Sequence, residues 1–363
     1  MFYLGLFIAV ASVPGYTSAS IPAGWAAMSI VLPLTLWREA KWSPLHSLFL
    51  AFLAFATLSL AWTPSALDGI FRLWQFSLIF LAFRLGSSLD NLTEILTGLA
   101  LGGVISSLLA IAQHFGINPV FVYSPGGEAP GLFFNHSLAG QTLALVAIAC
   151  LMFGLWWHLL LLLPGIYLSG SRGAWLVLGI GFICAYFPRP KLLILCIGCI
   201  LLVVIYSVSP SDLERIMIWR GVTTNLAFIG QGIGSFNSLF IWTGTRLIHP
   251  EYVHNDSLHL IFEFGIGACL LFIIIWACLT KTDRDEWPVI AAFVFLSFFA
   301  FPLFTPISAF LVALCAGRVS RSWSLPRLYL PNSRHAVTLR SGYAKFRESL
   351  PSSKAIPIQF RNP

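Results

Sequence analysis

The sequence predicts an all-α fold, a polytopic transmembrane helical bundle of about 12 spans with one long loop on the side away from the cytoplasm. Two observations support this prediction. Hydrophobic residues make up 58% of the chain and charged residues only 10%, whereas soluble globular proteins contain about 25% charged residues. Apolar runs that approach the roughly 20 residues needed to cross a bilayer also recur along most of the chain.

The expected helices follow these apolar runs. We place them at 2–13, 20–37, 45–62, 69–86, 92–115, 134–156, 158–169, 172–187, 191–209, 258–280, 287–301 and 303–317. Several are short, and half-helices or re-entrant hairpins would explain them, because a bilayer tolerates broken backbone where protein buries it. The amino-terminal run has no basic segment before it, so we expect a retained helix and not a cleaved signal.

The chain divides into a transmembrane domain, residues 1–317, and a basic tail, residues 318–363. The tail has nine Lys/Arg and one acid, a net charge of +8 (9 − 1), while the rest of the chain carries −1 (12 − 13). A basic segment beside the last span indicates the cytoplasmic side of the membrane. We expect the tail to be disordered and close to lipid head groups, and we do not expect it to bind nucleic acid.

With the tail in the cytoplasm, alternation of the spans assigns a side to every loop. Both termini are then cytoplasmic. Seven further Lys/Arg fall in cytoplasmic loops: Arg38, Lys41, Arg84, Arg189, Lys191, Lys281 and Arg284. The other five are all arginine: Arg72, Arg172, Arg215, Arg220 and Arg246. Four polar stretches fall on the opposite side, at 63–68, 116–137, 168–174 and 210–257. Because they gather Arg, His and Asn on one face, this face is predicted to hold a functional site.

The first part of the long loop, residues 210–257, carries signals of ordered structure. Ser211 and Glu214 match a capping box, which predicts a helix from about 212 to 225. In that helix Arg215 and Trp219 would share one face. Long loops are usually functional or disordered, and these signals favour a functional one.

The middle of the loop reads Gly230-Gln-Gly232-Ile-Gly234. Alternate glycines suit a tight turn or a close approach of the backbone to a ligand. The motif is not a dinucleotide-binding fingerprint, because no strand–turn–helix unit surrounds it.

The loop ends in His249-Pro-Glu251-Tyr-Val-His254-Asn255-Asp256, and the next helix follows at once. In that helix His259 and Glu263 share a face. Ionisable groups in a span are costly and often functional, but a hydrogen-bonded pair that faces the bundle explains them equally well. A zinc site at His249, Glu251 and His254 has no familiar ligand spacing, so no metal is expected.

In this order and spacing, the segments resemble the O-antigen ligase and O-antigen polymerase family of membrane glycosyltransferases. The matching residues are Ser171-Arg172-Gly173-Ala174, Arg215-x-x-x-Trp219, Gly232-x-Gly234-Ser235-Phe236, His254-Asn255 and Glu263-Phe-Gly265, preceded by Gly131-x-Phe-x-Asn135-His136. The resemblance covers residues 130–280, and the amino-terminal spans match only in hydropathy.

The resemblance implies a helical bundle in a bacterial inner membrane, with the long periplasmic loop over an outward-facing cavity. It also implies transfer of a glycan from undecaprenyl diphosphate to lipid A core, to a growing polysaccharide or to a protein, without a cofactor. The catalytic positions that it implies are Arg172, Arg215 and His254. The further substrate-binding positions that we expect are Arg72, Arg220, Asn135, His136, Gly232, Gly234, Asn255 and Glu263.

The residue types suit this chemistry. Guanidinium groups bind phosphate bidentately and remain charged, and fixed positive charge lowers the barrier as a diphosphate departs. His254 is expected to accept or orient the proton of the acceptor hydroxyl, because the intrinsic pKa of histidine lies near the working pH. Direct displacement would invert the anomeric configuration. Each residue also has an alternative, structural role. The arginines would extend to the membrane interface, and His254 would cap a helix.

A second class of function is a transporter or flippase for a lipid-linked glycan or a small anion. Broken spans near 168–173 and the ionisable Glu263 would suit such a protein. The preference for an enzyme comes mostly from the family resemblance, since composition alone does not separate the two.

Overall fold

The computed structural model describes residues 1–11, 20–117, 128–133, 135–186, 210–242, 247–250, 252–281 and 284–323. In these residues the fold is helical, as predicted, apart from one short β-ladder. Three helical segments are long and apolar enough to cross a membrane: Ala66–Ser88, Thr93–His114 and Asp256–Leu279. The expected helix at 191–209 and almost all of the basic tail lie outside the described residues.

The helices occur close to the expected positions. They are α1 (Phe2–Ala11), α2 (Ser20–Val31), η1 (Pro33–Trp37), α3 (Pro44–Ser59), α4 (Ala66–Ser88), α5 (Thr93–His114), α6 (His136–Met152), α7 (Trp156–Leu168), α8 (Arg172–Tyr186), α10 (Pro210–Thr223), η2 (Ser235–Ser238), α11 (Asp256–Phe264), η3 (Gly265–Gly267), α12 (Ala268–Leu279), α13 (Trp287–Leu296), η4 (Pro302–Phe304), α14 (Pro306–Ser320) and η5 (Arg321–Trp323). Strand β1 (Ile241–Trp242) pairs antiparallel with β2 (Leu247–Ile248), with Ile241 opposite Ile248.

Two expected helices are divided, α13 ends at Leu296 and not at 301, and the tail begins later than predicted. The helix expected at 20–37 breaks at Pro33, which has no N–H to continue the ladder. The helix expected at 258–280 breaks at Gly265, whose φ is +51°. The tail was predicted to start at residue 318, but α14 continues to Ser320 and η5 to Trp323.

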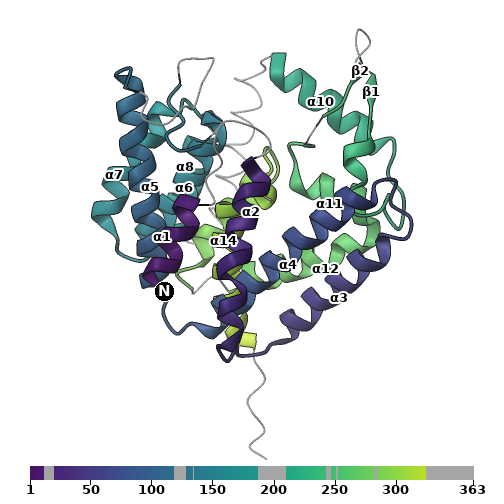
Figure 1. Ribbon diagram of the computed structural model, residues 1–363, viewed down its shortest axis with the longest axis horizontal. Coiled ribbons are helices and arrows are strands. Elements are labelled where there is room, and N and C mark those ends of the chain that lie inside the picture. The colour runs from purple at the N-terminus through teal and green to yellow at the C-terminus, as the bar shows by residue number, and fades with distance from the viewer. Residues whose placement is uncertain are drawn as a thin grey trace, which may run out of the picture. The chain divides into compact units, whose positions relative to one another are not determined.

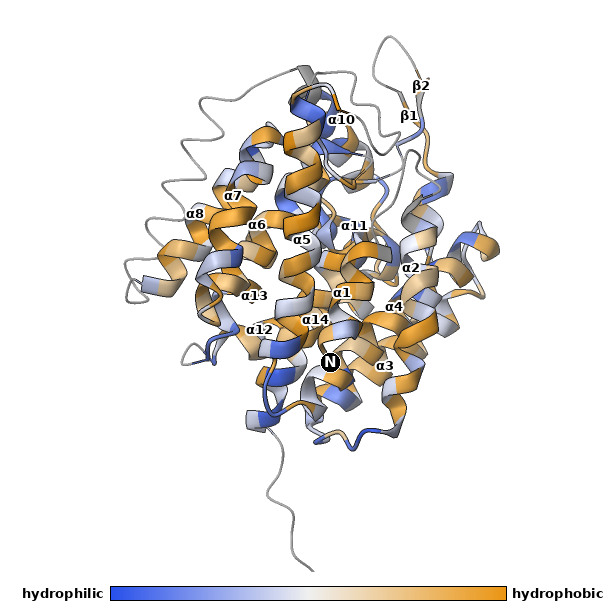
Figure 2. Cartoon of the chain, turned by 60° about the vertical axis from the view of Figure 1, so that its left-hand side comes forward, coloured by the Kyte–Doolittle hydropathy of each residue, from blue (hydrophilic) through white to orange (hydrophobic). Residues whose placement is uncertain are grey.

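The helices pack as neighbours around an apolar core. Helix α1 lies along α5, α14 along α4, and α6 against α7 and α8. Figure 1 shows α10 and the β1–β2 ladder together at one end of this bundle. Hydrophobic residues dominate the middle of the bundle, and hydrophilic ones gather toward its ends (Figure 2).

A group of buried phenylalanines joins four elements next to the candidate site. Phe52 of α3 and Phe76 of α4 meet edge to face at 5.0 Å, and Phe264 of α11 lies 4.9 Å from Phe52. Phe304 of η4 lies 6.4 Å from Phe76. Each such pair contributes about 0.5–1.5 kcal/mol beyond the burial of its surface. The cluster therefore fixes α4, α11 and η4 relative to one another.

Between α13 and α14 the chain leaves the helical conformation over residues 297–305, apart from the single turn of η4. We call this segment the α13–α14 break. Pro302, Phe304 and Thr305 within it are buried. Non-helical backbone inside a membrane protein persists where protein covers it or where it lines a site.

Candidate functional site

Arg72 is a buried cation on α4, with only 4% of its surface exposed. Its guanidinium carbon lies 4.1 Å from the centre of the Phe304 ring and 5.6 Å from that of Tyr252. Nη1 donates a hydrogen bond of 3.1 Å to Oε1 of Gln75. Cation–π contacts of this kind gain strength when they are desolvated. Because arginine does not lose its proton in proteins, the site contains a permanent positive charge.

The end of the long loop lies against the α13–α14 break, beside Arg72. The ring of Tyr252 stacks on that of Phe301, with centroids 4.0 Å apart and planes 6° from parallel. The ring of His254 meets the same Phe301 edge-on at 5.3 Å. One short segment, which holds both Phe301 and Phe304, therefore supports Tyr252, His254 and Arg72.

Helix α10 brings Arg215 to this group. Nε1 of Trp219 donates a hydrogen bond of 2.8 Å to the carbonyl of Val253, and the charge of Arg215 acts on His254. The predicted helix is thus confirmed, with its Arg and Trp directed at the end of the loop. Helix α10 begins at Pro210, one residue before the predicted N-cap Ser211. A proline suits the first helical position, and this places Ser211 inside the helix.

His254 has an unusual backbone and a shifted pKa. Its φ is +55°, and among the described residues no other non-glycine has a positive φ. Burial, and secondarily the charge of Arg215, lowers the pKa of His254 to about 4. The expectation of a pKa near neutrality is therefore wrong, because it took no account of burial. The imidazole is neutral at pH 7, and strained backbone of this kind occurs preferentially at functional sites.

Asp256 holds the end of the loop to the α13–α14 break, and sequence analysis did not single it out as a site residue. Its backbone N–H donates to the carbonyl of Ser297 at 2.7 Å. Its Oδ2 accepts from the N–H of Leu303 at 2.8 Å and from the Ser297 hydroxyl at 3.3 Å. The side chain of the preceding Asn255 caps α11 by accepting from the N–H of Leu258. The sequence did offer a signal for Asp256, because it is an acid directly after a His-Asn pair at the start of a span.

His259 and Glu263 form the buried pair that was one of the two expected alternatives. Nε2 of His259 lies 3.2 Å from Oε1 of Glu263, and both side chains are enclosed. The imidazole packs between the rings of Phe236 and Phe304. In the described part of the chain, Nδ1 of His259 and Oε2 of Glu263 have no hydrogen-bond partner. The structure thus places Glu263 inside the bundle.

The alternate glycines form the predicted tight turn. At these positions the backbone approaches another part of the protein closely, and not a ligand. The φ of Gly232 is +92° and that of Gly234 is +76°. A Cβ on Gly232 would lie 2.8 Å from the Cα of Thr63, and one on Gly234 would lie 2.3 Å from the N of Gly69. The Thr63 hydroxyl also donates to the carbonyl of Ile233 at 2.7 Å. These glycines therefore position the long loop against the start of α4.

A second group of predicted residues lies where α6 and α8 begin. Asn135 caps α6 by accepting from the N–H groups of Ser137 and Leu138. Nδ1 of His136 donates to the carbonyl of Ser169 at 2.7 Å, which leaves Nε2 as an acceptor. Helix α8 begins at Arg172, as predicted, and Arg172 is exposed.

The structure therefore brings Arg215 and His254 together and places Arg72 against Tyr252 and Phe304. Arg172 lies with Asn135 and His136 at the start of α6 and α8. Arg220 is exposed on a different side of α10 from Arg215, about 140° further round the helix. Arg246 and Glu251 lie outside the described residues. Within the described ranges, no group of three or more His, Cys, Asp or Glu side chains is arranged to hold a metal ion.

No model of a known protein family matches the chain, and a search of curated proteins finds no similar sequence.

Proposed function

We propose that this protein is a membrane glycosyltransferase of the O-antigen ligase or polymerase type. It moves a glycan from undecaprenyl diphosphate to lipid A core, to a growing polysaccharide or to a protein. The observation that carries the proposal is the pairing of Arg215 with the neutral and strained His254. Arg72 stacks on Phe304 of the α13–α14 break, which also supports His254 through Phe301. We place this site on the periplasmic side of a bacterial inner membrane, in a bundle of about 12 spans whose termini are both cytoplasmic.

The depth of Arg72 suits the diphosphate of a lipid-linked donor. It lies 16 residues before the end of α4 at Ser88, which corresponds to about 24 Å along a helix. The hydrocarbon core of a bilayer is about 30 Å thick. If Ser88 lies at the cytoplasmic face, Arg72 lies just inside the opposite one, where the diphosphate of a polyprenyl lipid meets the membrane.

The arginines would hold the donor and stabilise its departure. Each charge-assisted hydrogen bond to a phosphate oxygen contributes roughly 1.5–3 kcal/mol net. Negative charge grows on the diphosphate as its bond to the anomeric carbon breaks, so Arg72 and Arg215 would favour the transition state over the bound donor. Arg172 is proposed to contribute from the start of α8.

His254 is proposed to take the proton of the acceptor hydroxyl. The acceptor oxygen forms the new bond to the anomeric carbon, and the electron pair of the broken bond leaves with undecaprenyl diphosphate. The proton passes to the neutral imidazole, and the configuration inverts. A bound diphosphate would offset the charge of Arg215 and raise the pKa of His254, so the imidazole becomes a stronger base once the donor is present.

A transporter or flippase is the second candidate function. It is favoured by the buried ionisable residues Asp256, His259 and Glu263 beside a broken helix, a combination typical of transport sites.

Substitution of the arginines and the histidine tests the enzyme proposal. R172A, R215A and H254A are each expected to abolish glycan transfer in cells while the protein still inserts into the membrane. R38A is the control, because it removes an exposed arginine that is not a predicted site residue. Wild-type levels of glycan transfer by all three single variants, R172A, R215A and H254A, would refute the proposal that the protein is an enzyme. In liposomes, an enzyme makes a new glycoconjugate, whereas a transporter only relocates its substrate.

A further inference from the structure

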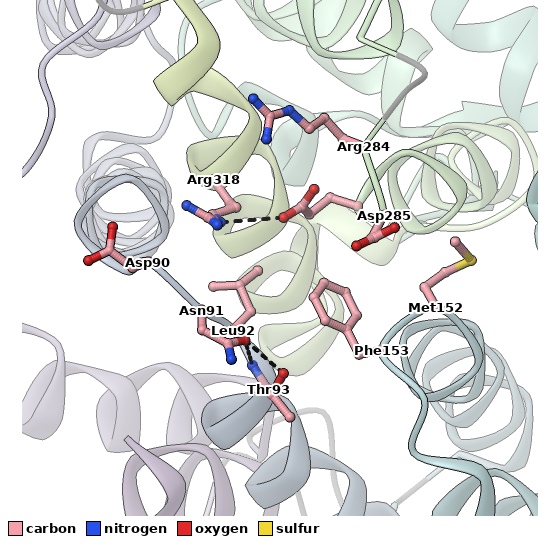
Figure 3. Close-up of a pocket in the computed structure, with 10 residues that line it drawn as sticks. Asp90, Asn91, Leu92, Thr93, Met152, Phe153, Arg284, Asp285 and Arg318 are labelled. Atoms are coloured by element: carbon pink, nitrogen blue, oxygen red, sulfur yellow. Dashed lines mark hydrogen bonds and ion pairs between the residues drawn. The ribbon is translucent and has the colours of Figure 1, made fainter.

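A pocket of about 500 Å³ lies at the end of the bundle where α4 turns into α5 (Figure 3). Both helices are candidate spans, so the turn at 89–92 that links them lies at a membrane face. Nearby, the ammonium of Lys281 lies 4.6 Å from the centre of the Trp323 ring. Aromatic and basic residues of this kind gather at the level of lipid head groups. The pocket therefore opens where head groups are present.

Two of the acids that line the pocket are already paired with basic residues. Asp90 forms ion pairs with Arg321 and Lys41. Glu286, which is buried, lies 3.7 Å from Nε of Arg318. Burial raises the pKa of Glu286.

Three charged groups remain available to a ligand. Arg284 and Asp285 are exposed, and within the described ranges neither side chain makes a hydrogen bond or ion pair. Arg318 makes only its long contact with Glu286 among those residues. In Figure 3 the guanidinium of Arg318 lies between Asp90 and Asp285.

The charges that remain available select the class of ligand. Arg284 and Arg318 are cationic, and Asp285 is anionic. A phosphate suits the two guanidinium groups, and an ammonium group suits the carboxylate. We propose that this pocket binds a phosphoethanolamine-type zwitterion, with its phosphate on Arg284 and Arg318 and its ammonium on Asp285. Because the pocket lies at a membrane face, the ligand is assigned as the head group of an aminophospholipid.

Lipid retention by the purified full-length protein in detergent tests this proposal, with native mass spectrometry as the readout. Phosphatidylethanolamine is expected to bind at least about ten-fold more tightly than phosphatidylglycerol with the same chains, a difference of about 1.4 kcal/mol. Phosphatidylcholine should also bind weakly, because its quaternary ammonium has no N–H to donate to Asp285. R284Q and D285N should each weaken phosphatidylethanolamine binding about ten-fold.

R38Q and E39Q are the matched controls, because both residues are exposed and neither lines the pocket. R318K is a second pocket variant, which keeps the charge near Glu286 but loses the planar fork. Equal binding of the two lipids, or equal losses from R284Q and R38Q, would overturn the proposal. Tighter binding of soluble glycerophosphoethanolamine than of the lipid would overturn the assignment to a membrane source. None of these results depends on glycan transfer.

Discussion

Replacing Asp256 with Ala should release the end of the long loop from the α13–α14 break. The side chain is only 3% exposed and accepts hydrogen bonds from the N–H of Leu303 and the hydroxyl of Ser297. An ordinary hydrogen bond contributes about 0.5–1.5 kcal/mol net, and leaving the buried N–H of Leu303 without an acceptor costs about 1–3 kcal/mol more. D256A should therefore lower the free energy of unfolding by about 2–4 kcal/mol.

Reversible unfolding of the purified protein in detergent measures this loss. D256N keeps an acceptor for the N–H of Leu303, so it should cost about 1–2 kcal/mol. D68A is the matched control, because Asp68 accepts from Ser65 within its own helical turn and is partly exposed, and it should change stability by less than about 1 kcal/mol. If D256A unfolds like the wild type while D68A does not, Asp256 does not fasten the loop.

Three other measurements follow from the site. Because the pKa of His254 is lowered in the folded state, this residue should favour the folded state above pH 6.5 and oppose it progressively as the pH falls toward about 4. NMR titration of the labelled imidazole should give a midpoint near pH 4, and R215Q should raise that midpoint. G232A should destabilise by more than about 2 kcal/mol, since its Cβ would meet Thr63, whereas G179A, which faces open space, should be neutral or stabilising in the same unfolding assay. W219F should lose about 1 kcal/mol and increase hydrogen exchange at the end of the loop.

The positions of the helices could be predicted from the sequence because the lengths of the apolar runs set them. Helix α8, expected at 172–187, spans Arg172–Tyr186. The break at Pro33 also had a local signal, although a single helix was expected there. The break at Gly265 had no such local signal, because a tertiary contact causes it. A Cβ on Gly265 would lie 2.2 Å from the carbonyl oxygen of Phe228. Contacts between distant segments decide such positions, and one sequence does not reveal them.

The candidate site was predictable in its residue types and less so in its physical state. Arg215 and His254 could be identified from the motifs around the long loop. The low pKa of His254 could not, because it arises from burial, which depends on the packing of Phe301 and the rest of the α13–α14 break. Arg72 was ranked below Arg172 and Arg215 because nothing nearby in the sequence shows that Phe304, from the far end of the chain, stacks on it.

The α13–α14 break also bears on the choice between an enzyme and a transporter. Alternating access requires one part of the bundle to move against another around the site. Here Arg72 stacks on Phe304, Tyr252 on Phe301, and Asp256 binds both Ser297 and Leu303, so motion at the break would have to disrupt all of these contacts together. A transferase has the opposite requirement, because its charges must be fixed before the diphosphate departs. The fastening of the break therefore supports the transferase.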